Sequence, residues 1–212
     1  MNVNVRDPAA ANRRAQWMRQ LRTWHWISGA ISLVSMLLFA ITGITLNHSS
    51  AIESKPSVTS KDATLESAAL ADLAKEPRTG RAPVPAHVAE AVTRAVGIDV
   101  AGREAEWSET EAYISLPRPG GDAWLSIDRK SGEITYEKTD RGWISYLNDL
   151  HKGRHTGSAW SLFIDVFALC SVVFCITGLL LLQMYAKGRA STWPLVGFGL
   201  GLPVIIALFL IH

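Results

Sequence analysis

Three apolar runs divide the chain, and a long polar segment separates the first run from the second. The runs cover residues 27–46, 162–183 and 195–211. The first contains no charged residue and has the roughly 20 positions that a helix needs to cross a hydrocarbon core, whereas the third is only just long enough. We predict transmembrane helices at residues 24–48, 151–185 and 193–212, with a short loop at 186–192 between the last two.

The polar segment, residues 49–150, has the pattern of a small α+β domain. After a polar connector at 49–60, helical spacing is found at 64–75 and 84–96. From 104 to 138 the period changes to two, in short runs at 105–108, 112–116, 124–127 and 134–137 that are separated by turns rich in Pro, Gly and Asp. We predict an antiparallel meander with a helix packed on it.

Composition agrees with this mixed architecture. Hydrophobic residues make up 48% of the 212-residue chain, too many for an ordinary soluble domain, and the 19% of charged residues is too many for a chain wholly within a membrane. The net charge of +2 says little about partners, and no feature points to nucleic acid.

The distribution of basic residues predicts the orientation. Residues 1–23 form a basic segment, expected as an interfacial helix, and Lys187 and Arg189 lie in the loop at 186–192. Both segments should be cytoplasmic, which places 49–150 and the C-terminal His212 in the periplasm of a bacterial inner-membrane protein. The first run is longer than the apolar region of a signal peptide, so we favour a retained anchor. The arginines of the basic segment are Arg6, Arg13, Arg14, Arg19 and Arg22.

Several chemistries are excluded. The two cysteines, Cys170 and Cys175, are five positions apart in one predicted helix and cannot pair with each other. The chain has no Cys-x-x-Cys-His for covalent haem attachment and no Walker, Rossmann or His-Glu-x-x-His pattern. An electron donor would therefore have to come from elsewhere, as a membrane quinol or another redox protein.

Four of the six histidines lie at the predicted membrane edges, with His25 inside and His48, His151 and His155 outside. Because the first two spans run in opposite directions, His48 reaches the same membrane level as the other two outer histidines. Neutral imidazole is a common ligand of haem iron, and two imidazoles on opposite faces give a low-spin electron-transfer centre. The alternatives are interfacial polar side chains or a zinc site.

His151 and His155 are not expected to ligate one haem together. Residues four apart on a helix share a face, so their nitrogens cannot lie on opposite sides of one porphyrin. One of them must pair with a residue from another helix, and His48 is the available partner. His25 is about 34 Å from His48 along a helix and cannot share a metal with it.

Several motifs carry a resemblance to a known family. The segment 125–128, followed by Ser-Gly-Glu-Ile at 131–134, resembles the turn of the PepSY domain. Trp-His-Trp at 24–26, Thr-Gly-Ile-Thr-Leu-Asn-His at 42–48 and Leu-His-Lys-Gly at 150–153 resemble the PepSY-associated transmembrane proteins over residues 21–185. The chain departs from better-studied members in having three predicted spans, where they have four or more.

This resemblance implies a non-covalent haem b protein that transfers electrons across the membrane to a periplasmic acceptor, with ferric siderophores the acceptor proposed for related reductases. It also favours His151 over His155 as ligand, because His151 occupies the Leu-His-x-Gly position. PepSY domains are also attached to peptidases and sensors, so the alternative is a cofactor-free, membrane-tethered module for peptidase control or complex assembly.

His25 has no histidine partner at the inner ends of the other two spans. A second haem there would need Met184, a non-protein ligand or His25 of a second copy. The last option predicts a symmetric homodimer.

Overall fold

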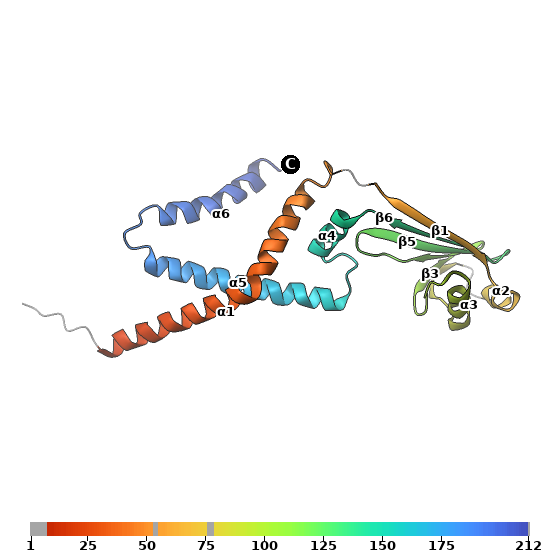
Figure 1. The fold of residues 1–212 in the computed structure, drawn as a ribbon, viewed down its shortest axis with the longest axis horizontal. Helices are drawn as coiled ribbons and strands as arrows, with labels where there is room; N and C mark the ends of the chain where they lie inside the picture. Colours follow the sequence, from red (N-terminus) through yellow and green to blue (C-terminus); the bar gives the residue numbers. More distant parts are fainter. Residues whose placement is uncertain (1–7, 53–54, 76–78, 212) are drawn as a thin grey trace, which may run out of the picture. The chain divides into compact units, whose positions relative to one another are not determined.

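The computed structural model describes residues 8–52, 55–75 and 79–211, and it contains two compact units (Figure 1). One unit comprises residues 1–37 and 164–212, and the other comprises residues 38–163. Arg6 and the C-terminal His212, both used above to argue the orientation, lie outside the described residues.

Three helices are long and apolar enough to cross a membrane: α1 (Pro8–Asn47), α5 (Ser158–Tyr185) and α6 (Thr192–Phe209). α1 is continuous from the basic segment into the first span, and it begins at a proline, which suits a first helical turn because no amide hydrogen is needed there. Large apolar side chains such as Trp26, Leu33 and Leu200 are exposed on these helices, as expected for surfaces solvated by lipid. The prediction of three membrane helices is confirmed.

The polar segment forms a six-stranded antiparallel sheet of order β1-β6-β5-β4-β3-β2. The predicted meander corresponds to β3 (Glu104–Trp107), β4 (Glu111–Ser115), β5 (Gly121–Asp128) and β6 (Glu133–Asp140). The two edge strands, β1 (Ser57–Thr64) and β2 (Gly80–Pro83), were not predicted. β1 begins within the last four residues of the expected polar connector at 49–60. It was missed because an exposed edge strand has no buried face and hence no alternation to recognise.

Two helices cover one face of the sheet, α2 (Ser67–Leu73) and α3 (Ala86–Val96) (Figure 1). α3 ends where Gly97 adopts a left-handed conformation, as the sequence predicts. Alternate residues of β5 and β6 point into the core, and burial of each large one stabilises the domain by about 1.5–3 kcal/mol. Fully buried core side chains are Leu73, Val88, Val92, Val100, Ile114, Leu125, Ile127 and Ile134.

The opposite face of the sheet is polar and acidic. The strand register places eight carboxylates there against one arginine on the described strands, Arg81, which is ion-paired with Glu106. Near the middle of the face, Tyr113 and Trp124 stack with ring centroids 6.1 Å apart. The carboxylates are those of Asp62, Glu104, Glu106, Glu111, Asp122, Asp128, Glu133 and Glu137.

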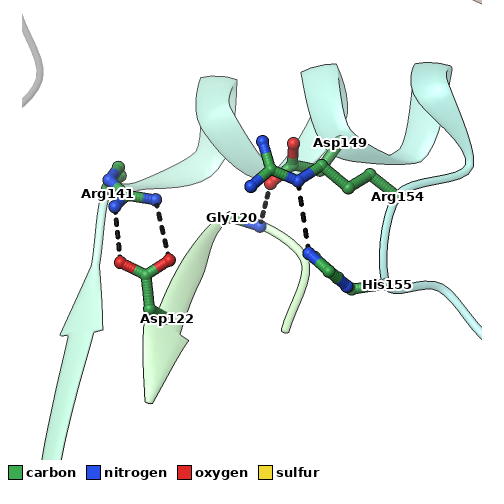
Figure 2. Close-up of polar contacts among 6 residues, drawn as sticks. All are labelled: Gly120, Asp122, Arg141, Asp149, Arg154 and His155. Atoms are coloured by element: carbon green, nitrogen blue, oxygen red, sulfur yellow. Dashed lines mark hydrogen bonds and ion pairs between the residues drawn. The ribbon is translucent and has the colours of Figure 1, made fainter. Parts of the chain in front are cut away.

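A further helix, α4 (Trp143–Lys152), connects the sheet to the second span and was not predicted as a separate element. In its last turn Asp149 Oδ2 accepts a hydrogen bond from the Gly120 N–H at 2.9 Å, and just before α4 Arg141 pairs with Asp122 of β5 (Figure 2). Asp149 is 9% exposed, so this contact is shielded from water. α4 is therefore fixed to the end of the sheet rather than lying free beside it.

Candidate histidine sites

His151 lies in the last turn of α4 and rests on α1. Its Nδ1 is 2.7 Å from Thr42 Oγ1, and its ring centroid is 4.9 Å from that of Phe39. A Cβ at Gly43 would lie 3.6 Å from His151 Cε1, so the imidazole sits directly over the glycine. We call His151 with Phe39, Thr42 and Gly43 the His151 seat.

The hydrogen bonds of Thr42 favour one tautomer of the neutral His151 ring. Thr42 Oγ1 lies 2.9 Å from Leu38 O and 3.2 Å from Phe39 O, so its single hydrogen is donated to the backbone. Toward His151 the hydroxyl must then accept, which requires Nδ1–H in the neutral imidazole. The lone pair is left on Nε2, the form in which histidine binds a metal through Nε2.

His48 follows α1 directly and is exposed. Its Nδ1–H donates to Ile44 O at 3.0 Å, because a carbonyl can only accept, and its lone pair therefore also lies on Nε2. Within the described ranges no hydrogen bond or ring contact joins His48 to His151.

His155 differs from both. Its Nε2 accepts a hydrogen bond from Arg154 Nε at 3.2 Å (Figure 2), so this lone pair is already engaged. The expectation that His155 shares a helix face with His151 is wrong, because α4 ends at Lys152 with Gly153 in a left-handed conformation. The preference for His151 came from its Leu-His-x-Gly position, and the engaged nitrogen of His155 adds to it.

His25 lies in α1 and contacts α5. Its Nδ1 is 3.1 Å from Thr177 Oγ1 and 3.2 Å from Phe174 O, and its ring stacks on Phe174 at 4.3 Å between centroids. A Cβ at Gly178 would lie 3.2 Å from His25 Cε1. Thr177 donates to Val173 O at 2.7 Å, so His25 also carries its proton on Nδ1. We call His25 with Phe174, Thr177 and Gly178 the His25 seat.

A family model described as "Putative PepSY_TM-like" matches residues 16–212, which is most of the chain and reaches into both units. The chain belongs to this PepSY_TM-like family. No curated protein and no solved structure matches it. The family match confirms the resemblance seen in the motifs, and with the three spans and the six-stranded sheet it confirms a membrane protein with a small α+β PepSY-like domain.

The sequence also held a signal that was not used. In this PepSY_TM-like chain Phe-x-Ile-Thr-Gly occurs twice, at residues 39–43 and 174–178. Thr42 and Gly43 were noted only within the motif at 42–48, and Phe39, Phe174 and Thr177 were not singled out. Searching the first two spans for a shared motif would have found both seats.

A zinc site in the PepSY_TM-like protein finds no support. Within the described residues no group of three or more His, Cys, Asp or Glu side chains is placed to hold a metal. In each seat the Nε2 atom of one imidazole has no hydrogen-bond partner among the described residues. Such a nitrogen can supply a single bond to a metal ion.

Proposed function

We propose that this protein is an inner-membrane haem b protein that passes electrons to a periplasmic acceptor, with residues 49–150 in the periplasm. The observation that supports the proposal is the state of His151, whose Nδ1–H is bonded to Thr42 and whose Nε2 lone pair is open. His151 and His48 would hold the haem iron, because both have the proton on Nδ1 and both lie at the same end of α1.

The residues of the His151 seat fit such a group. Gly43 allows the imidazole to lie close to α1, and Phe39 contacts the ring from the same helix. Lys152 and Arg154 are exposed cations next to His151, suited to bind carboxylate groups of a ligand. When bound, haem supplies one-electron transfer, while the chain holds the imidazole in place and in its Nδ1-protonated form.

The rest of the proposal follows from orientation and family. The basic residues near the start of α1 and in the loop before α6 place those segments in the cytoplasm. The electron donor is a quinol or another redox protein, and the acceptor is a ferric siderophore or another periplasmic oxidant. A homodimer would supply a second His25 if a haem binds at that end of α1.

The test is the colour of the protein. Full-length protein purified in detergent from haem-replete cells should show the absorption bands of haem b. H151A and H48A should each show weaker bands than the wild type because the haem at that site is lost, whereas H155A should keep the wild-type intensity. Colourless wild-type protein would overturn the proposal. Weaker haem bands in H151A but not in H48A would mean that a residue other than His48 is the second ligand.

A second candidate function is a membrane-tethered binding module, and the acidic face of the sheet favours it. The face as a whole carries eight carboxylates, and its stacked pair Tyr113 and Trp124 lies near its middle. This excess of negative charge and the aromatic pair suit a cationic protein segment.

Calorimetric titration of the full-length protein with a lysine-rich peptide tests this second function. Glu137 lies directly opposite Trp124 on the sheet, so E137Q should weaken binding by about 0.2–1 kcal/mol and W124A should weaken it further. A neutral peptide of the same length is the control. Equal heats for the two peptides would exclude this function.

A further inference from the structure

The two seats are built in the same way from different helices. In each, one histidine ring contacts the Phe, Thr and Gly of a Phe-x-Ile-Thr-Gly segment on a partner helix. The distances from Nδ1 to the threonine Oγ1 are 2.7 and 3.1 Å, and those between ring centroids are 4.9 and 4.3 Å. The glycine leaves 3.6 Å in one seat and 3.2 Å in the other between Cε1 and a Cβ placed there.

The threonines also match in their remaining hydrogen bonds. Each donates to the carbonyl four residues earlier, at 2.9 Å for Thr42 and 2.7 Å for Thr177, and to the one three residues earlier more weakly. The hydroxyl hydrogen of each threonine already has a backbone carbonyl as its acceptor, so the threonine does not need the histidine as a hydrogen-bond partner. The histidine N–H, by contrast, needs an acceptor within an apolar span.

We propose that Thr42 and Thr177 are positioning residues that hold His151 and His25 in the same Nδ1-protonated form. The His25 seat is then a second binding site, equal in kind to the His151 seat, for a group that bonds Nε2. The identity of that group as haem rests on the proposed function, whereas the role of the two threonines does not.

The two seats differ in the number of acceptors near Nδ1, and this difference predicts effects of different size when the threonine hydroxyl is removed. His151 Nδ1 has Thr42 as its acceptor, whereas His25 Nδ1 also lies 3.2 Å from Phe174 O. Removal of the hydroxyl therefore takes a larger share of the hydrogen bonding from His151 than from His25.

Nitrogen NMR of full-length protein with ¹⁵N-labelled histidine, free of added cofactor, tests the threonines. T42V should lower the ratio of the Nδ1–H to the Nε2–H form of His151 about two- to tenfold, the effect of one hydrogen bond. T177V should produce a smaller change at His25. T42S and T177S keep the hydroxyl and should restore the wild-type ratios. Unchanged ratios in both valine variants would overturn the positioning role.

Titration with haemin tests the second site. Wild-type protein should bind at two sites, of which H151A removes one and H25A removes the other. A single site that survives H25A would overturn the site at His25 while leaving the proposed function intact. No binding at all would overturn both the proposed function and the His25 site, and the NMR ratios would still decide the role of the threonines.

Discussion

The His151 seat and the His25 seat share a motif but are supported by different parts of the molecule. His25 belongs to α1, so its place depends on the long spans α1 and α5 alone. His151 belongs to α4, a helix of ten residues in which Asp149, two positions before His151, is hydrogen-bonded to Gly120 at the end of the sheet. The ring planes reflect this difference, since His25 is nearly parallel to its phenylalanine at 13° and His151 is tilted at 41°.

A chain of hydrogen bonds leads from the sheet to the helix that carries His151. From the sheet, contacts run from Gly120 through Asp149 into α4, and from α4 to α1 through Asn148, which accepts from Thr45 Oγ1 at 2.8 Å. Trp160 Nε1–H donates to Leu150 O at 2.9 Å and fixes the start of α5 to the same helix. A ligand or partner that moves the end of the sheet would therefore act on His151.

Gly120→Ala should give the largest difference between the effect on His151 and the effect on His25. Gly120 has φ +76°, and a Cβ there would lie 2.8 Å from Tyr146 Cβ and 2.9 Å from its Cα. Strain and overpacking together should lower the free energy of unfolding of the sheet domain by about 2–5 kcal/mol. Histidine NMR should show the His151 signals altered and those of His25 retained.

Gly102→Ala is the matched control for that variant. Gly102 also has a positive φ, +68°, but no atom lies within 4 Å of a Cβ placed there. It should destabilise the domain by about 1–2 kcal/mol through backbone strain and leave His151 unchanged. Loss of the His25 signals in Gly120→Ala would contradict the independence of the two seats.

Asp149→Ala should have the next largest effect. It removes the acceptor of the Gly120 N–H, and a buried donor left without a partner costs about 1–3 kcal/mol. The variant should lower the unfolding temperature and increase the motion of His151, measured by NMR line widths. Asp149→Asn keeps a side-chain oxygen and should retain most of the stability, and equal loss in both variants would point to the charge instead.

Much of the fold could be predicted from the sequence because the physical signals were local. Apolar length identified the spans, and alternation identified β3 to β6, whose inward residues such as Leu125 and Ile127 form the core. β1 and β2 were missed because almost all of their residues are exposed and neither shows an alternating pattern. α4 was missed as a separate helix because its last two residues fall within the span predicted at 151–185.

The sites were predicted less completely, for a reason of geometry. A histidine at a membrane edge is visible in the sequence, but the acceptor of its Nδ1–H lies 109 residues away for His151 and 152 residues away for His25. His155 was placed on the helix of His151 because residue spacing alone does not show that Gly153 ends that helix. The pairing of His48 with His151 stays a prediction.

A smaller change should distinguish how tightly the two rings are packed. Gly178→Ala brings a Cβ to 3.2 Å from His25 Cε1, whereas Gly43→Ala brings one to 3.6 Å from His151 Cε1. The first contact requires the ring to shift, which should lower the free energy of unfolding by about 1 kcal/mol. The second is an ordinary van der Waals contact. NMR shifts of His25 should change more in its variant than those of His151 in the other. The reverse order would show that the His151 seat is the tighter one.

Acid should destabilise the sheet domain through the turn between β5 and β6. The N–H groups of Ser131 and Lys130 donate to Asp128 Oδ1 at 2.7 and 2.8 Å and hold the pKa of this carboxyl below its ordinary value of 3.8. A lowered pKa in the folded state means that the ionised carboxylate contributes stability above pH 3.8, and that this stability is lost as pH falls through the folded-state pKa. Asp128→Asn should therefore make the unfolding temperature of the domain fall less steeply below about pH 4.

Asp72, whose pKa is lowered mainly by Lys75, offers the control. Asp72→Asn should also make the unfolding temperature fall less steeply with pH, without altering the turn. If neither variant changes the slope, the acid sensitivity of the domain lies outside these two carboxylates.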